Sequence, residues 1–240
     1  MLAVVLAAAA LLNWQLDPDR WHKVLTGTIA LRAGGVRALY NSFRFVGPPA
    51  NTDFVILCTQ ELEEAHRQEL RSWGIKVLEV EHFRAWQLTQ YDRVLLLDTD
   101  VIFLRRLDKV FTWCTPVMAS DLPPSDFKPA GMFISTACRI CTFVCWMDPG
   151  LLSGVETLVI DQTILGSAFA DKWNFRPPLQ TIKRGLEGKS KQEAVETLDD
   201  LGSFLLHFVG SNKPWLNKTE EDRVYAGAHE LWWDMRNLQN

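Results

Sequence analysis

Short apolar runs alternate with amphipathic segments along much of the chain. Residues 53–58 and 93–97 contain apolar runs of strand length, which are typical of buried strands in a parallel sheet, and residues 75–80 indicate a further strand. Residues 34–43 and 60–73 repeat apolar side chains at helical spacing. Because strands alternate with helices, the pattern predicts an α/β fold with a mostly parallel central sheet flanked by helices.

The same pattern predicts elements in the remainder of the chain. We expect a first strand over 21–30, a short helix over 83–91, a buried strand over 205–208 and a closing amphipathic helix over 220–238. Residues 174–200 are rich first in proline and then in charged side chains, which favours a surface excursion without a core.

The N-terminal run, MLAVVLAAAALL, is almost wholly apolar. It is too short to cross the hydrocarbon core of a membrane, and it lacks a basic flank. A secretory signal, the remnant of an anchor and a packed terminal helix all fit it. We therefore predict an apolar N-terminal segment over 1–20 and a single domain over 21–240. Localisation stays open between the Golgi or secretory lumen and the cytoplasm.

The composition indicates a globular domain and argues against a nucleic-acid-binding or disulfide-rich protein. The 240 residues are 48% hydrophobic, which supplies the core of one large domain. A net charge of −4 without a basic stripe argues against a nucleic-acid partner. The five cysteines, an odd number, do not resemble a disulfide framework. We expect Cys138, Cys141 and Cys145 to be buried thiols on one helical face, because no second ligand pair has zinc-site spacing.

Two acids, Asp98 and Asp100, directly follow an apolar strand. Ligands collect at the carboxyl ends of parallel strands, although a solvated turn is the alternative for an isolated acid pair. His207 ends a later strand, and Gly210 and Lys213 follow it. Two carboxylates and an imidazole suit a divalent ion such as Mn²⁺. A glycine allows close approach to a phosphate and a lysine adds positive charge, so these residues predict a metal-diphosphate site.

With these residues the chain resembles glycosyltransferase family 8, the glycogenin-like enzymes of the GT-A (Rossmann-like) fold. The resemblance runs from about Val24 to Trp215. Its motifs follow the family's order: FRAWQLTQY at 83–91, Leu97-Asp98-Thr99-Asp100, Gly131, Asp161-Gln162, and HFVGSNKPW at 207–215.

The resemblance implies transfer of a hexose from a UDP-sugar with retention of configuration, assisted by Mn²⁺. Asp98, Asp100 and His207 match the family's metal ligands. The residues that match donor contacts are Leu25, Thr26, His82, Asp98, Thr99, Asp100, Gly210 and Lys213. Asp161 and Gln162 match the pair near the anomeric carbon and, with Lys213, are the catalytic candidates; the alternative for Asp161-Gln162 is an exposed helix N-terminus.

The chain departs from the family's pattern on the donor side. His82 stands where the family has a lysine, Arg32 replaces a tyrosine that stacks on uracil, and Pro129-Ala130 replaces a polar pair. No tyrosine lies between Gln162 and His207, so self-glucosylation is not expected. Two functions stay open: a transferase acting on an external saccharide, protein or lipid acceptor, and a catalytically weak nucleotide-sugar-binding or scaffold protein. A homodimer also stays open.

Overall fold

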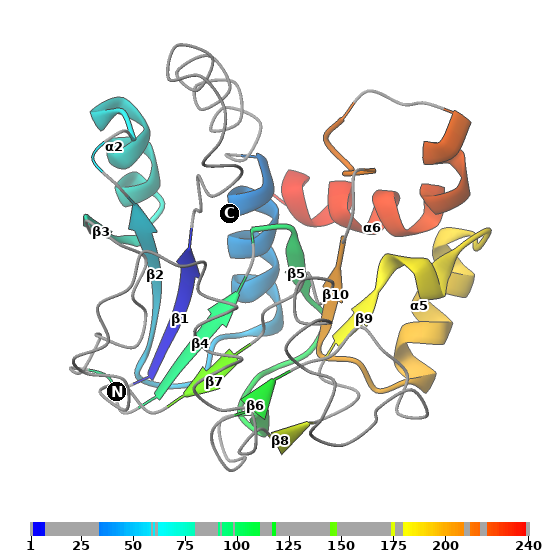
Figure 1. Cartoon of the computed structure of the whole chain (residues 1–240), viewed down its shortest axis with the longest axis horizontal. Helices are drawn as coiled ribbons and strands as arrows, with labels where there is room; N and C mark the ends of the chain where they lie inside the picture. Colours follow the sequence, from blue (N-terminus) through cyan, green and yellow to red (C-terminus); the bar gives the residue numbers. More distant parts are fainter. Residues whose placement is uncertain are drawn as a thin grey trace, which may run out of the picture. The chain divides into compact units, whose positions relative to one another are not determined.

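The structure is a computed structural model of the chain (Figure 1). It describes residues 2–7, 34–58, 60, 62–79, 91, 93–97, 99–110, 117–118, 145–147, 174–175, 180–208, 212–216 and 220–238. The chain divides into two compact units that interleave in sequence. Unit 1 comprises Met1–Asp17, Ala50–Asp98 and Phe111–Arg176, and unit 2 comprises Pro18–Pro49, Thr99–Val110 and Pro177–Asn240. The prediction of a single domain over 21–240 stays a prediction.

Unit 1 is built on a seven-stranded sheet with the order β3-β2-β1-β4-β7-β6-β8 (Figure 1). Its strands are β1 (Leu2–Ala7), β2 (Thr52–Cys58), β3 (Lys76–Glu79), β4 (Arg93–Leu97), β6 (Val117–Met118), β7 (Cys145–Met147) and β8 (Asn174–Phe175). The pairings β3-β2, β2-β1, β1-β4 and β6-β8 are parallel, and β7 is antiparallel to both β4 and β6. The predicted parallel sheet is therefore confirmed for β2, β3 and β4.

The apolar N-terminal run supplies β1, which lies between two strands of this sheet. Leu2 pairs in register with Thr52 of β2 and with Arg93 of β4. Parallel neighbours on both edges are typical of strands with a continuous apolar sequence. The packed-helix alternative is wrong for residues 2–7, because they are extended. The strand predicted over 21–30 lies outside the described residues.

The helix α2 (Glu64–Ser72) connects β2 with β3. It begins at Glu64, so the sequence-based start near residue 60 is wrong. Its end is as predicted, because Gly74 has a φ of 86°, a left-handed conformation that only glycine adopts without strain. No helix in the described part of the chain is long and apolar enough to cross a membrane.

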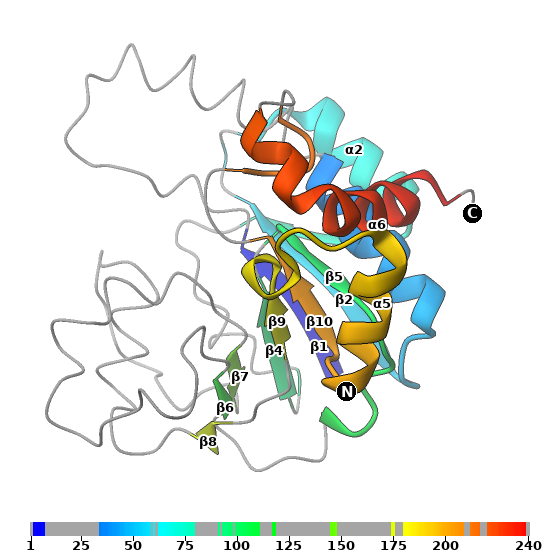
Figure 2. The ribbon, with the colours of Figure 1, turned by 90° about the vertical axis from the view of Figure 1, so that its right-hand side faces the viewer.

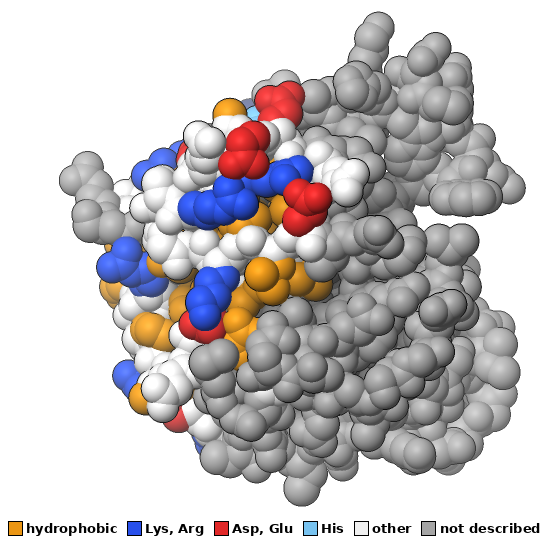
Figure 3. All heavy atoms as spheres, turned by 90° about the vertical axis from the view of Figure 1, so that its left-hand side faces the viewer, with side chains coloured by type: hydrophobic (Ala, Val, Ile, Leu, Met, Phe, Trp, Pro, Cys, Tyr) orange, Lys and Arg blue, Asp and Glu red, His pale blue; other side chains and the backbone are white. Residues whose placement is uncertain are grey.

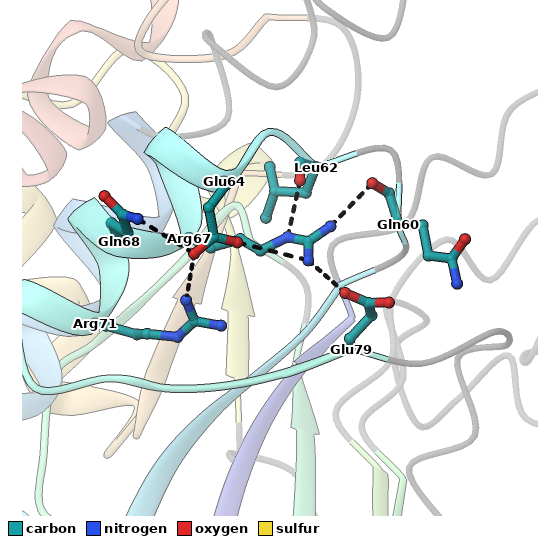
Figure 4. A network of polar contacts seen from close by, with 7 residues as sticks. All are labelled: Gln60, Leu62, Glu64, Arg67, Gln68, Arg71 and Glu79. Atoms are coloured by element: carbon teal, nitrogen blue, oxygen red, sulfur yellow. Dashed lines mark hydrogen bonds and ion pairs between the residues drawn. The ribbon is translucent and has the colours of Figure 1, made fainter.

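A polar network around Arg67 holds the loop between β2 and α2 (Figure 4). The guanidinium donates to the carbonyl oxygens of Leu62 at 2.8 Å and Gln60 at 2.9 Å, and it forms an ion pair with Glu79 at the end of β3. Carbonyl groups outside a helix or strand need such partners. Arg67 therefore holds Gln60 and Leu62 in a non-helical conformation, although the sequence pattern predicts that they belong to the helix.

Charges of opposite sign alternate on the described part of the face shown in Figure 3. Ion pairs of unit 1 include Arg71 with Glu64 at 2.8 Å and Lys76 with Asp53 at 2.5 Å. Exposed pairs of this kind contribute little stability.

The described cysteines fit the prediction only in part. Cys58 is a buried free thiol, and burial raises its pKa, an effect that Arg67 partly offsets. Cys145 lies in the strand β7, so its assignment to a helical face is wrong. Cys138 and Cys141 lie outside the described residues.

Unit 2 is built on a three-stranded sheet with the order β5-β10-β9. Its strands are β5 (Val101–Phe103), β9 (Gln180–Ile182) and β10 (Leu205–His207); β10 is antiparallel to β5 and parallel to β9. Its helices are the helix over 34–46, α5 (Lys191–Asp200), α6 (Ala226–Asn237) and the 3-10 helices η5 (Lys183–Leu186) and η6 (Glu220–Tyr225). Figure 2 shows α5 beside β9 and β10.

The core of unit 2 draws on the sheet and all three α-helices. Its buried members are Ala38, Ile102, Leu186, Ala194, Leu198, Leu206, Phe208, Ala228, Leu231 and Trp232. The Asn41 side chain, also buried, donates to the carbonyl oxygens of Met235 at 3.0 Å and Arg236 at 3.2 Å. These bonds satisfy carbonyls in the last turn of α6 and attach it to the helix over 34–46.

The prediction of a coreless surface excursion over 174–200 is wrong. This stretch contains two short strands, η5 and α5, and Leu186 and Leu198 join the core. The Ser190 hydroxyl accepts a hydrogen bond from the Glu193 N–H, and the Glu193 carboxylate accepts one from the Ser190 N–H. This capping box was readable in the sequence, because Ser-x-x-Glu marks a helix start.

Gly227 lies where α6 meets the turn that precedes α5. A Cβ at this position would lie 2.5 Å from the Lys189 carbonyl oxygen and 2.7 Å from the Lys191 nitrogen. We expect Gly227→Ala to lower the free energy of unfolding by about 2 kcal/mol, because the clash is with backbone that cannot rotate away. Urea unfolding measures this. The matched control is Gly185→Ala, whose Cβ would meet only the Thr181 methyl at 3.5 Å. Equal stability of the two variants would contradict the expected packing.

Tyr91 donates from its hydroxyl to the Asp53 carboxylate at 3.0 Å. Burial, with Asp53 as acceptor, raises the pKa of Tyr91 from 10.0 to about 12. Since the folded pKa lies above the unfolded one, this group contributes stability that is complete below pH 10 and declines as pH rises to about 12. We expect the stability difference between the wild type and Tyr91→Phe to shrink across that window in denaturant titrations. A difference that is constant with pH would count against the contact.

Candidate functional site

The Asp100 backbone is fixed by the ladder between β5 and β10. Asp100 directly precedes β5, and its carbonyl oxygen accepts a hydrogen bond from the Phe208 N–H at 2.9 Å. His207, at the end of β10, pairs in register with Val101. Backbone pairing between β5 and β10 therefore brings Asp100 next to His207, although the two residues are far apart in the sequence.

The Asp100 side chain has a partner on each oxygen. His207 Nε2 lies 3.1 Å from one carboxylate oxygen, and the Lys213 ammonium donates to the other. Because an ionised carboxylate can only accept, the imidazole carries its proton on Nε2 in this arrangement. Lys213 also donates to the Phe208 carbonyl oxygen at 2.7 Å. Asp100 and His207 are 8% and 1% exposed, so the cluster is largely removed from solvent.

Asp100 is held in its charged form despite burial. Burial raises the pKa of Asp100, but the opposing effects of His207 and Lys213 are together larger and hold that pKa well below its usual range. The site is therefore a buried anion that depends on positively polarised partners.

Residues 212–216, which carry Lys213, are held by side chains from other elements. Lys183 of η5 donates to the Asn212 carbonyl oxygen, and the Trp233 indole of α6 donates to the Pro214 carbonyl oxygen at 3.1 Å. Trp215 packs against Trp232 with ring centres 5.4 Å apart. The C-terminal helix, which follows the part of the chain that resembles the family, therefore supports the site.

The helix over 34–46 lies against the turn that precedes Asp100. A Cβ on Gly35 would lie 2.8 Å from the Thr99 carbonyl oxygen and 3.6 Å from the Trp215 ring. Glycine is therefore required for this approach, and it links the turn at Thr99 to the loop at Trp215.

Sequence reasoning missed two residues of this region, Lys183 and Trp233. Lys183 was assigned to a surface excursion, yet it is only 3% exposed. Its position after β9 depends on a strand of three residues that gives no clear sequence signal. Trp233 is marked only by its place in an amphipathic helix, which does not distinguish a packing residue from a hydrogen-bond donor.

Of the predicted site residues, the structure brings Asp100, His207 and Lys213 together. Thr99 directly precedes Asp100. The others lie outside the described residues, and their roles stay predictions: Leu25, Thr26, His82, Asp98, Asp161, Gln162 and Gly210.

The described donors fit a divalent cation. Asp100 offers carboxylate oxygens, and His207 Nε2 would offer an imidazole nitrogen once it gives up the proton that it donates to Asp100, a donor set that would suit Mn²⁺. The Lys213 ammonium shows that the carboxylate accepts a cationic partner. Among the residues with described positions, no three His, Cys, Asp or Glu side chains converge on one point, and Asp98 is not among those residues.

Sequence comparisons find relatives that are named as glycosyltransferases. No model of a known protein family matches the chain. UDP-glucuronate:xylan alpha-glucuronosyltransferase 1 of Arabidopsis thaliana is 25% identical over 235 residues, which cover 83% of this chain and 34% of that protein. Glycogenin-1 of Caenorhabditis elegans is 28% identical over 157 residues, which cover 62% of this chain and 34% of that protein. The chain thus spans about a third of the length of such relatives.

Comparison with solved structures shows the fold. The galactosyltransferase LgtC, in complex with donor and acceptor sugar analogs, superposes with a TM-score of 0.59 at 14% identity, covering 98% of this chain and 95% of that chain. The GT-A fold predicted from the sequence is confirmed. The similarity to glycogenin and to xylan glucuronosyltransferases, together with the GT-A fold, confirms the resemblance to the glycogenin-like glycosyltransferases of family 8.

Proposed function

We propose that this chain is a glycosyltransferase domain that moves a hexose from a UDP-sugar to an external acceptor, with retention of configuration and Mn²⁺ assistance. The observation that carries the proposal is the buried Asp100 carboxylate held by His207 and Lys213. A relative named for a UDP-glucuronate donor supports the same donor class. The acceptor is a saccharide, a protein or a lipid.

The roles of the described residues follow from their charges. Asp100 and His207, together with Asp98 from the resemblance, would hold Mn²⁺, which when bound supplies a Lewis acid for the diphosphate oxygens. Lys213 stabilises the negative charge that the departing UDP gains. In the structure this ammonium contacts Asp100. A cation at Asp100 would take over neutralisation of the carboxylate, which frees Lys213 for the diphosphate.

The reacting centre is assigned from the resemblance alone. Asp161 and Gln162 are proposed to lie near the anomeric carbon, where they stabilise an oxocarbenium-like transition state or orient the acceptor. Leu25 and Thr26 are proposed to hold the nucleoside, and Gly210 the diphosphate. UDP-glucuronate is the first donor to test, because three relatives carry it in their names.

A second function is a catalytically weak nucleotide-sugar-binding or scaffold protein. The substitutions that favour it, His82 and Pro129-Ala130, affect the donor side and leave the diphosphate residues unchanged. A neutral histidine in place of a lysine removes a permanent charge at neutral pH. Such a protein would bind UDP with the metal yet fail to transfer the sugar.

Hydrolysis of UDP-sugars separates the two functions. With Mn²⁺ present, we expect the chain to release UDP from at least one common UDP-sugar, UDP-glucuronate being tested first. UDP binding by calorimetry without any UDP release would support the scaffold function. Absence of both binding and release would contradict both.

The Asp100→Asn variant tests the diphosphate site. Asparagine keeps the shape of the side chain but removes its charge, so we expect Mn²⁺-dependent UDP affinity to fall at least about tenfold. Asparagine is preferable to alanine here, because alanine would leave His207 facing a void. Isothermal calorimetry measures the affinity. Asp108→Asn is the matched control, because Asp108 is an exposed acid paired with Arg106. Wild-type affinity in Asp100→Asn would contradict a metal role for Asp100.

A further inference from the structure

We propose that Lys183 is a positioning residue for the diphosphate site, acting through the peptide that joins Asn212 to Lys213. This inference rests on the proposed function, in which Lys213 contacts the diphosphate. The geometry that supports it is the hydrogen bond from the Lys183 ammonium to the Asn212 carbonyl oxygen.

The fold delivers Lys183 to the site through strand pairing. β9 runs parallel to β10, and its last residue, Ile182, pairs in register with His207. Lys183 is the next residue and begins η5. The chain after β9 and the chain after β10 therefore leave the sheet side by side, which brings Lys183 to the loop that carries Lys213.

Lys183 is held inside the fold rather than exposed on its surface. It is only 3% exposed, whereas a lysine is rarely so deeply buried without polar partners. Its ammonium lies 4.8 Å from the centre of the Tyr225 ring, a distance that allows a cation-π interaction. The Asn212 carbonyl and the Tyr225 ring together fix the direction of the side chain.

The hydrogen bond to Asn212 constrains Lys213 directly. A trans peptide unit is planar, so the Asn212 carbonyl and the Lys213 N–H point in opposite directions. Holding the carbonyl toward Lys183 therefore sets the orientation of the Lys213 backbone, from which the functional ammonium extends. On the other side of Lys213, the Pro214 carbonyl accepts from Trp233 at 3.1 Å. Lys213 thus lies between two peptides that are anchored from outside the loop.

This anchoring has a functional consequence. A loop held in its binding conformation loses less conformational freedom when the ligand binds, so its affinity is higher. Methionine at position 183 has similar length and apolar character but cannot donate to the Asn212 carbonyl. The peptide before Lys213 would then be free to rotate, and the Lys213 ammonium would meet the diphosphate less often.

A double-mutant cycle on the full chain tests this role. In calorimetry with UDP and Mn²⁺, we expect Lys183→Met to bind UDP about tenfold more weakly than the wild type. The matched control is Arg184→Met, which removes the same charge from the adjacent exposed residue and should change affinity less than about twofold. When Lys213 is already methionine, Lys183→Met should have less than about a twofold further effect, because the two residues act through one contact.

The outcomes separate this inference from the proposed function. Wild-type UDP affinity in Lys183→Met would overturn the positioning role alone. A further tenfold loss of UDP affinity when Lys183→Met is added to Lys213→Met would also overturn the positioning role. Independent effects of the two substitutions would mean that Lys183 has only a structural role. Absence of UDP binding by the wild type would overturn the proposed function and this inference with it. If Lys183→Met does not fold, as judged by thermal unfolding, Lys183→Gln is measured by the same criteria.

Discussion

Removing an ionised carboxylate from water costs several kcal/mol, and in unit 2 the interactions of Asp100 with two neighbouring side chains offset this cost. Both compensating groups come from the segment that ends β10 and continues to Trp215: His207 lies at the strand end and Lys213 in the loop after it. Their positions depend on the register of β5 against β10, because a shift by one residue would turn His207 to the opposite face. Fold and site are therefore specified by the same strand pairing.

The sequence predicted the parts of the fold in which local pattern and tertiary environment agree. β2 and β4 are short apolar runs with buried residues, and burial in a parallel sheet requires that composition; β3 is the edge strand and is only partly buried. The convergence of Asp100, His207 and Lys213 was also predicted, because their residue types suit a metal-diphosphate site. The antiparallel pairing of β5 with β10, which places Asp100 beside His207, was not predicted.

Other features were set by tertiary contacts that the sequence pattern does not reveal. The run at Leu2–Ala7 is a strand only because β2 and β4 flank it, and by composition alone it also fits a signal or a helix. The polar stretch over 174–200 hid α5, whose buried face is limited to Ala194 and Leu198. Lys183 was misread for a similar reason: a lysine in a charged segment is usually exposed, and only the β9-β10 pairing carries this one inward.

The position of Lys213 connects the structure with the proposed chemistry. The Lys213 ammonium is a counterion of the buried Asp100 carboxylate, so this anion is neutralised within the protein. Binding a divalent cation at Asp100 would make that contact redundant at the moment when diphosphate oxygens need a positive partner. Under the proposed function, this exchange would keep each buried charge paired throughout, which is the condition under which buried ions are tolerated. Anchoring the Lys213 backbone at Asn212 and Pro214 then has a clear physical purpose: the ammonium can change partners while the loop that carries it stays in place.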